Sequence, residues 1–228
     1  MISVIIAGAG RGKRIDNTPK AFIKIGGREL VYHSLDKFCT ITREIAVVLP
    51  AEYVKKWRDR LGKAYKNIRV LAGGETRQDS VSAGLRSLKN RDGIVLVHDV
   101  ARPFFSEEIL NSVVKGAEKY GACIPCIPVG DTIKEFEGNL IKKTLNREKI
   151  VQVQTPQAFR YSVLTAAYGK AWKDSFCGSD DSVLVERIGR KVYLVPGSPE
   201  NMKITYPADI ELAEILLEQW KKKNAGKA

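Results

Sequence analysis

The chain has 228 residues, 44% of them hydrophobic, and a formal net charge of +12. A chain of this length buries one sizeable core, so we expect a single domain over residues 1–228, and no apolar run approaches the ~18 residues of a membrane helix. The positive charge suits a nucleic acid, an anionic membrane surface or a polyphosphate substrate. However, no stripe of aromatic residues alternates with Lys and Arg, which disfavours a nucleic-acid binder.

Short apolar, β-branched runs alternate along the chain with segments of helical periodicity. The runs span residues 4–6, 45–49, 68–71, 94–97, 122–127 and 192–195. Apolar residues recur at helical spacing in residues 30–38, 81–88 and 210–220. Strands that alternate with helices and are continuously apolar predict a buried, mostly parallel sheet. We therefore expect an α/β fold with a Rossmann-like, doubly wound sheet and helices on both faces.

A glycine-rich loop follows the first expected strand. It has the sequence Ala-Gly-Ala-Gly-Arg-Gly-Lys-Arg over residues 7–14, and Lys20 lies shortly after it. Its glycines would let backbone N–H groups approach a phosphate at the carboxyl end of a strand. The dinucleotide pattern needs Gly at Lys13, and the P-loop needs Ser or Thr at Arg14, so the loop matches neither. The cations Arg11, Lys13 and Arg14 nevertheless indicate an anion site of another kind.

Three further polar clusters lie beside expected strands or helices. They comprise residues 73–80, 98–103 and 201–205. Asp79 or Ser80 is suited to cap the helix that follows the first cluster, and Pro207 fits the first turn of the last helix. Asp99, at a strand end, could hold a metal ion or a sugar hydroxyl beside a triphosphate, or it could simply cap its loop.

Residues 132–144 do not fit the α/β pattern. Two strand-like runs flank the dipeptide Gly138-Asn139, which is a strong hairpin signal. Neither face of this hairpin is consistently apolar, and an isolated hairpin is marginal in water. We expect it to lean on another surface, such as a second subunit, and the alternative is a mobile surface hairpin.

The cysteines and histidines do not form a recognisable chemical site. The four cysteines are too few and too scattered for a disulfide framework, and the first strand begins at Ile2, so we expect reduced thiols in a cytoplasmic protein. Cys123 and Cys126 have metal-site spacing but lie in an apolar run without a second pair, which favours core packing. We interpret His33 as structural and His98 as a residue that orients its loop.

Seven short motifs occur in an order that resembles the 2-C-methyl-D-erythritol 4-phosphate cytidylyltransferase family over nearly the whole chain. They are Gly8-Ala-Gly-Arg-Gly-Lys-Arg14, Pro19-Lys20, Gly73-Gly74-x2-Arg77-x2-Ser80-Val81, His98-Asp99-x-Ala101-Arg102-Pro103, Asp131-Thr132, Gln154-Thr155-Pro156-Gln157 and Asn201-x-Lys203-Ile-Thr205. The resemblance implies a Mg²⁺-dependent transfer of CMP from CTP to methylerythritol phosphate, which gives 4-diphosphocytidyl-2-C-methylerythritol and pyrophosphate in non-mevalonate isoprenoid biosynthesis. It also implies a cytoplasmic homodimer, with no nucleic-acid or membrane partner, whose hairpin arms, about residues 131–153, reach across to the other subunit.

The resemblance also implies roles for individual residues. Catalytic roles fall to Arg14, Lys20, Arg147 and Lys203. The CTP site would comprise Gly8, Ala9, Gly10, Gly12, Gly74, Glu75, Ser80 and Asp99. The acceptor site would comprise Asp99, Arg102, Thr132, Arg147, Thr155 and Ser179. No residue is assigned as a dedicated metal ligand.

Two alternative functions remain open at this point. A ribitol 5-phosphate or other sugar-phosphate cytidylyltransferase would share the CTP loop, but it tends to have a Cys-Asp-type run where this chain has Ser179-Asp180-Asp181. Ser179 replaces the threonine usual in the methylerythritol enzymes and keeps the hydroxyl group. The second alternative is a non-catalytic module that uses its positive charge to bind a nucleic acid.

Overall fold

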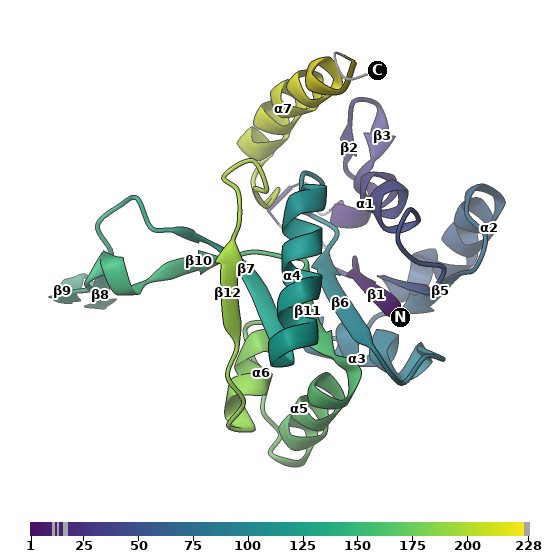
Figure 1. Cartoon of the computed structure of the whole chain (residues 1–228). Helices are drawn as coiled ribbons and strands as arrows, with labels where there is room; N and C mark the ends of the chain where they lie inside the picture. Colours follow the sequence, from purple (N-terminus) through teal and green to yellow (C-terminus); the bar gives the residue numbers. More distant parts are fainter. Residues whose placement is uncertain (11, 13, 16–17, 226–228) are drawn as a thin grey trace.

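A mostly parallel sheet forms the centre of the computed structural model (Figure 1). Within the residues that the structure describes, 1–10, 12, 14–15 and 18–225, it has eight strands in the order β10-β7-β11-β6-β1-β4-β5, with β12 also paired to β7. The strands are β1 (Ile2–Ala7), β4 (Ile45–Leu49), β5 (Ile68–Ala72), β6 (Ile94–Asp99), β7 (Ala122–Pro128), β10 (Val151–Val153), β11 (Gln157–Arg160) and β12 (Tyr193–Pro196). Arg11 and Lys13, two of the predicted loop cations, lie outside the described residues.

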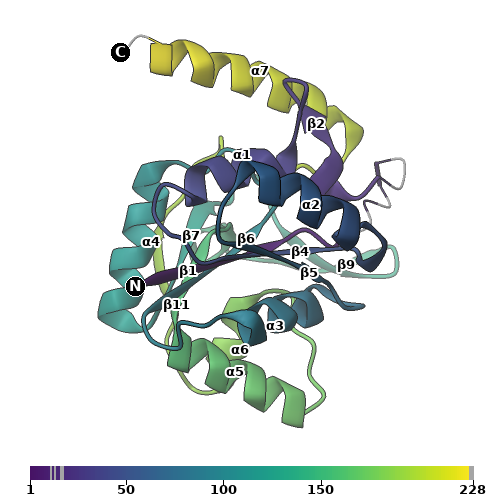
Figure 2. The ribbon, with the colours of Figure 1, turned by 90° about the vertical axis from the view of Figure 1, so that its right-hand side faces the viewer.

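Helices cover both faces of the sheet (Figure 2). One face carries α1 (Leu30–Phe38), α2 (Val54–Ala64), α4 (Glu107–Tyr120) and α7 (Pro207–Ala225), and the other carries α3 (Arg77–Ser87), α5 (Tyr161–Lys173) and α6 (Asp181–Arg187). Successive residues of β1 point to opposite faces, so Val4 and Ile6 join one apolar cluster and Ile5 joins the other. The predicted doubly wound α/β fold is confirmed.

Strand register brings the polar clusters of the sequence together. β1 pairs in parallel with β4 and with β6, and Ala7 at the end of β1 lies opposite Asp99 at the end of β6. β11, which the apolar pattern did not predict, inserts antiparallel between β6 and β7. Its insertion places Thr155 beside Asp99, whose backbone N–H donates to the Thr155 hydroxyl at 3.0 Å. The carboxyl edge of the sheet is therefore where chemistry-bearing side chains gather.

The helix that follows β5 begins differently from the prediction. Thr76, and not Asp79 or Ser80, is the N-cap of α3: its hydroxyl accepts from the Asp79 N–H at 3.0 Å, and the Asp79 carboxylate accepts from the Thr76 N–H at 3.0 Å. This reciprocal capping box satisfies two N–H groups that the first turn leaves without partners. Pro207 is the first residue of α7, as predicted.

The predicted hairpin is present and projects from the body (Figure 1). It consists of β8 (Lys134–Glu137) and β9 (Leu140–Thr144), and the short helix η3 (Arg147–Lys149) follows it. Gly138 has a φ of 57°, the left-handed conformation that the Gly-Asn turn requires. Every residue of β8, β9 and β10 is exposed. We call the segment of residues 131–153 the arm.

The remaining elements are short. They are β2 (Lys24–Ile25), β3 (Arg28–Glu29), η1 (Lys20–Phe22) and η2 (Ala51–Tyr53). None of the described helices is both long and apolar enough to cross a membrane. The element η1 matters for function because it carries Lys20.

Candidate active site

A cavity of about 580 Å³ opens at the carboxyl ends of β1 and β6. Its lining includes these residues of the predicted nucleotide site: Gly8, Ala9, Gly10, Gly74, Glu75, Ser80 and Asp99, together with the predicted cations Lys20 and Lys203. The described part of the chain reaches this cavity in five segments: at the end of β1, at Lys20, between β5 and the first turns of α3, at the end of β6, and at Lys203 before α7. Segments that are far apart in the sequence therefore form one concave site.

Close backbone packing explains the glycine after β5. A Cβ atom at Gly73 would lie 2.4 Å from the Ala9 Cβ and 2.6 Å from the Ser80 Oγ, so a side chain there would force the two walls of the cavity apart. The Ser80 Oγ also accepts from the Gly74 N–H at 3.2 Å. At Gly10, by contrast, a Cβ would meet no atom within 4 Å, so the backbone at Gly10 faces open space.

Two predicted residues of the loop do not line the cavity. Gly12 has a φ of 60°, and a Cβ there would lie 1.9 Å from the Thr18 carbonyl oxygen, so this glycine is required by the backbone path. Arg14 is exposed, and its guanidinium lies 5.5 Å from the centre of the Tyr206 ring. Both residues hold positions beside the site, and neither borders the described cavity.

Asp99 is the centre of the charged groups in the site. Its side chain is buried, and its two oxygens accept from Arg77 Nε at 2.8 Å and from Lys203 Nζ at 2.6 Å. Burial alone would raise the pKa of Asp99, but the charges of Arg77 and Lys203 outweigh it and hold this pKa well below its ordinary value. Asp99 is therefore ionised at neutral pH.

Sequence reasoning gave no role to Arg77, although it belongs to a quoted motif. Arg77 lies between Asp99 and Asp181, whose Oδ2 is 2.8 Å from Arg77 Nη1, and Tyr168 donates to the other Asp181 oxygen at 2.6 Å. Burial would lower the pKa of Arg77, but Asp181 and Asp99 raise it above its ordinary value. The buried pair fixes the start of α3 relative to the end of β6.

Lys20 and Lys203 enter the cavity from different elements. Lys20 Nζ donates to the carbonyl oxygen of Ile204 at 2.7 Å, the residue next to Lys203. Burial lowers the pKa of Lys20, and the charge of Lys203 lowers it further, while Asp99 opposes both effects. Because two ammonium groups repel each other across the cavity, an anion between them would stabilise the arrangement.

A second cavity of about 420 Å³ adjoins the first and shares Arg77, Asp99 and Lys203 with it. Of the predicted acceptor residues, its lining includes Asp99, Arg102, Thr155 and Ser179. Arg102 is fixed by backbone carbonyls, because its Nη1 donates to Asn201 at 2.7 Å and its Nη2 to Val153 at 3.2 Å. The shared wall therefore carries two cations, Arg77 and Lys203, beside the ionised Asp99, so each cavity has positive charge available for an anion.

Comparison with known proteins decides the family. A family model described as 2-C-methyl-D-erythritol 4-phosphate cytidylyltransferase (IspD) matches residues 2–219. The chain belongs to this family. The enzyme of that name from Clostridioides difficile is 40% identical over 227 residues, which are 97% of this chain and 96% of the relative.

Solved structures of the family have the same fold. The 2-C-methyl-D-erythritol 4-phosphate cytidylyltransferase of Thermus thermophilus superposes with a TM-score of 0.79 and 37% identity over 94% of this chain and 97% of that chain. The 4-diphosphocytidyl-2C-methyl-D-erythritol synthase of Anaerococcus prevotii gives a TM-score of 0.84 and 34% identity over 96% and 98% of the two chains. The resemblance inferred from the sequence motifs is confirmed.

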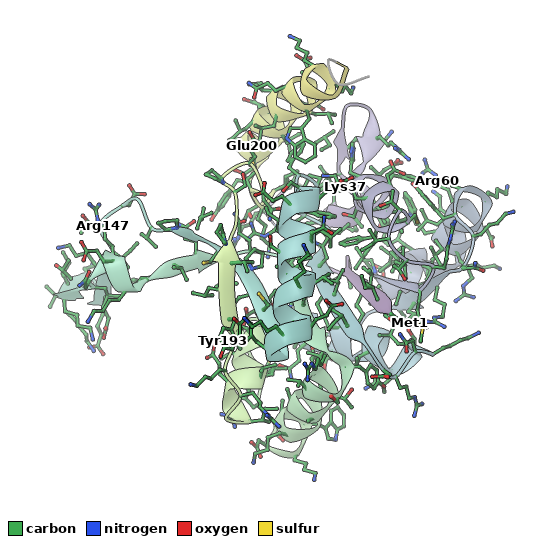
Figure 3. The ribbon with its side chains drawn as sticks, in the orientation of Figure 1. Met1, Lys37, Arg60, Arg147, Tyr193 and Glu200 are labelled. Carbon is green, nitrogen blue, oxygen red and sulfur yellow. The ribbon has the colours of Figure 1, made fainter. Side chains whose placement is uncertain are left out.

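The arm residues are the exception in this cytidylyltransferase site. Thr132 and Arg147 line neither cavity. Arg147 donates to the Gly130 carbonyl oxygen at 2.7 Å, and Figure 3 shows it on the arm, well away from the body. A single chain therefore does not bring these two predicted acceptor residues to its own site.

Both histidines make contacts within the fold. His98 is fully buried, packs edge-on against Phe38 and Phe105, and has a ring nitrogen 3.1 Å from the Thr155 hydroxyl. Burial lowers the pKa of His98 to about 3, so the ring is neutral at physiological pH. The Nε2 of His33 lies 3.1 Å from the Ile25 carbonyl oxygen, which agrees with a structural role.

The four cysteines differ in burial. All four are free thiols. Cys123 is packed in the core, as predicted, whereas Cys126 is only partly buried. Throughout the described part of the chain, no group of three or more His, Cys, Asp or Glu residues could hold a metal ion.

Proposed function

We propose that the first cavity binds CTP, that the second binds methylerythritol phosphate, and that CMP transfer takes place where both meet Asp99. Enzymes of this family transfer CMP from CTP to 2-C-methyl-D-erythritol 4-phosphate. The observation that carries the assignment of the two cavities is their shared wall of Arg77, Asp99 and Lys203. It provides one point at which a triphosphate and an acceptor phosphate can lie side by side.

The chemistry requires no protein nucleophile. A phosphate monoester, whose second pKa is about 6, is largely a dianion at neutral pH. Its oxygen attacks the α-phosphorus of CTP, the new P–O bond forms, the bond to the bridging oxygen breaks, and pyrophosphate leaves with the electron pair. This agrees with a site whose buried histidine, His98, has a pKa of about 3 and is neutral.

The protein contributes positive charge and alignment. Lys20 and Lys203 both line the cavity, and Lys20 donates to the carbonyl oxygen of Ile204, so the two cations can neutralise charge that builds up around the α-phosphate. We assign Arg14 to the same group because it is the last residue of the glycine-rich loop and lies next to Tyr206. Ser80 and the backbone of Gly8, Gly10 and Gly74 would receive the nucleotide.

The donor set fits Mg²⁺ that arrives with the nucleotide. Two carboxylates, those of Glu75 and Asp99, line the first cavity. Mg²⁺ is usually held by one or two carboxylates together with substrate phosphates, so a larger protein cluster is not required. We assign Asp99 as its protein ligand. When bound, the ion would neutralise phosphate charge and hold the triphosphate in one conformation.

The arm supports a homodimer. Phe136, Leu140 and Ile141 expose large apolar side chains on it, 70% in the case of Phe136. An isolated hairpin with such residues is marginal in water, so a second copy of the chain is the natural cover. In that dimer Arg147 and Thr132 would complete the acceptor cavity of the partner. We place the enzyme in the cytoplasm, with no nucleic-acid or membrane partner.

The test is a pyrophosphate-release assay with purified protein. CTP, ATP, GTP and UTP are each combined with methylerythritol phosphate and with ribitol 5-phosphate in the presence of Mg²⁺. The proposal predicts release with CTP and methylerythritol phosphate that exceeds every other combination by at least about a hundredfold in kcat/KM. Equal or faster release with ribitol 5-phosphate would overturn the acceptor assignment, and loss of preference for CTP would overturn the donor assignment.

A further inference from the structure

One aromatic side chain of the C-terminal helix touches both loops that carry the central ion pair. We define the Asp99 loop as residues 99–105 and the Lys203 loop as residues 197–206. Trp220 in α7 packs edge-on against Phe104 of the first loop, with ring centres 5.8 Å apart. Its indole N–H donates to Glu200 Oε2 of the second loop at 3.0 Å. Trp220 thus connects two segments that lie about a hundred residues apart in the chain.

Lys37 contacts the face of the Trp220 indole and also binds the Asp99 loop. Lys37 Nζ is 3.9 Å from the centre of the Trp220 ring, and it donates to the carbonyl oxygens of Pro103 at 2.9 Å and Phe105 at 2.6 Å. Lys37 and Glu200 both lie beneath α7 (Figure 3). One ammonium group therefore fixes two carbonyls of this loop while the indole face covers it.

The free-energy cost of burying the Lys37 amine indicates that Lys37 does more than fill space. Burial lowers the pKa of Lys37 to about 7, so the fold retains an amine whose charged form is disfavoured at this position. A leucine or methionine would fill the same space without that cost. What the lysine adds is directional hydrogen bonding to a loop that contains Asp99 and Arg102.

The relative placement of the two loops sets the geometry of the site. The Ile204 N–H donates to the Ala101 carbonyl oxygen at 2.9 Å, and the Ile204 carbonyl accepts from Lys20 at 2.7 Å. One residue earlier, Lys203 pairs with Asp99 at 2.6 Å. A shift of the Lys203 loop would therefore move both lysines relative to Asp99.

Two other side chains of α7 bind backbone N–H groups near the site. The Asp209 carboxylate accepts from the N–H groups of Thr205 at 2.7 Å and Tyr206 at 2.8 Å. The Glu214 carboxylate accepts from the Gly26 N–H, at 2.9 Å and 2.8 Å to its two oxygens, shortly after the element that carries Lys20. Among these contacts, Trp220 is the side chain that reaches both loops.

We propose that Trp220, with Lys37 beneath it, is a positioning residue for CMP transfer: it holds the Asp99 loop and the Lys203 loop in the register that the reaction requires. The inference rests on the proposed function of this site. Trp220 lies on the outer side of both loops and contacts no cavity wall described above. Its influence is on alignment, which is worth up to about a hundredfold in rate for a displacement near 1 Å.

The experiment compares three tryptophan variants of the full chain. Trp220→Ala removes the bridge, Trp220→Phe keeps an aromatic ring but loses the N–H, and Trp172→Ala is the matched control because Trp172 is 76% exposed on α5, across the sheet. We expect kcat to fall between about tenfold and a hundredfold in Trp220→Ala and less in Trp220→Phe, with KM for CTP within about threefold of wild type. Trp172→Ala should match the wild type.

A double-mutant cycle distinguishes positioning from simple packing. Lys37→Met and Trp220→Phe are combined, and kcat and the thermal midpoint are measured for each protein. If Lys37 and Trp220 position the loops together, their losses in kcat are non-additive. The double variant is then little slower than the worse single variant. Additive losses that follow the loss of thermal stability would overturn the proposal, as would an unchanged kcat in the well-folded Trp220→Phe and Trp220→Ala proteins.

Failure of this inference is distinguishable from failure of the proposed function. If the wild-type protein does not transfer CMP, the proposed function fails. If the wild type transfers CMP and every Trp220 variant does so equally well, only the positioning role is wrong. Should Trp220→Ala be unfolded, two milder variants decide the question: Glu200→Gln weakens the bond to the indole N–H without a change of volume, and Trp220→Phe loses that bond but removes less volume than alanine does.

Discussion

The first cavity and the arm differ in how their charged and apolar side chains are placed. Around Asp99, charged side chains are paired within one chain: Arg77 binds the buried carboxylates of Asp99 and Asp181, and Lys203 binds Asp99 as well. On the arm, ion pairs such as Lys143–Glu135 are open to solvent and apolar residues such as Phe136 are exposed. The cavity is assembled by a single chain, whereas every residue of the hairpin strands β8 and β9 on the arm is exposed. This difference supports the proposal that a single chain forms the CTP cavity and that the arm of a second subunit completes the acceptor cavity.

Replacing Arg77 tests how much the ion pairs beside the first cavity stabilise the fold. Arg77→Ala would leave the buried carboxylate of Asp181 without its ionic partner, while Asp99 keeps Lys203, and removing one partner of a buried pair costs about 3–5 kcal/mol. We expect a loss of stability of that size in urea unfolding, together with loss of activity. Arg147→Ala on the arm is the comparison variant and should leave the free energy of unfolding of the chain unchanged. Equal stability of both variants would contradict the account.

Replacing Lys20 tests chemistry without disturbing the fold. Lys20→Ala should lower kcat at least about a hundredfold, or about 3 kcal/mol of transition-state stabilisation, because a fixed cation is lost where charge develops. Lys24→Ala, an exposed lysine four residues away, is the matched control. Pyrophosphate release and the thermal midpoint are measured for both. Turnover of Lys20→Ala near that of the control would remove Lys20 from the catalytic group.

Replacing Glu44 should have the smallest free-energy effect of the three substitutions, and this effect should depend most clearly on pH. Burial alone would raise its pKa, but hydrogen bonds from Ser3, Arg69 and the backbone of Lys89 lower it from 4.5 to about 2. Because the pKa is lower in the folded state, the stabilisation is present above pH 4.5 and is lost as the pH falls from 4.5 towards 2.

Glu44→Gln should therefore destabilise the protein by about 1–2 kcal/mol at pH 7, after allowance for solvent screening, and by much less near pH 2–3. The measurement is urea unfolding across this range. On the arm, Glu135→Gln removes an exposed pair and should cost less than about 0.5 kcal/mol at every pH. A pH-independent difference between Glu44→Gln and wild type would contradict this account of Glu44.

The layered architecture was predictable from local pattern. Continuously apolar runs become the buried strands β1, β4 and β6, because parallel strands covered on both faces must be apolar on both. β11 escaped prediction because its four residues, Gln157–Arg160, have polar ends and only a short apolar centre. It is placed in the sheet by its neighbours β6 and β7, and a local pattern carries no information about them.

The sequence predicted many of the residues that line the candidate site, but it did not predict which of them contact one another. Strand-end logic located Asp99, and the resemblance gave Lys20 and Lys203. Neither indicated that Arg77 joins Asp99 to Asp181, because that bridge depends on how α3 and α6 approach each other in three dimensions. The turn chemistry of Gly138-Asn139 predicted the hairpin correctly, but its direction away from the body is a property of the folded chain.

The most direct test of the central claim is complementation between two inactive variants. Lys20→Ala and Arg147→Ala are purified separately and mixed under conditions that allow subunits to exchange, and pyrophosphate release is then measured. If each arm completes the partner's site, one of the two sites in each heterodimer regains both residues, and random exchange restores about a quarter of wild-type activity. If the arm serves the site of its own chain, or if the protein is monomeric, the mixture stays as inactive as its components, which would contradict the account.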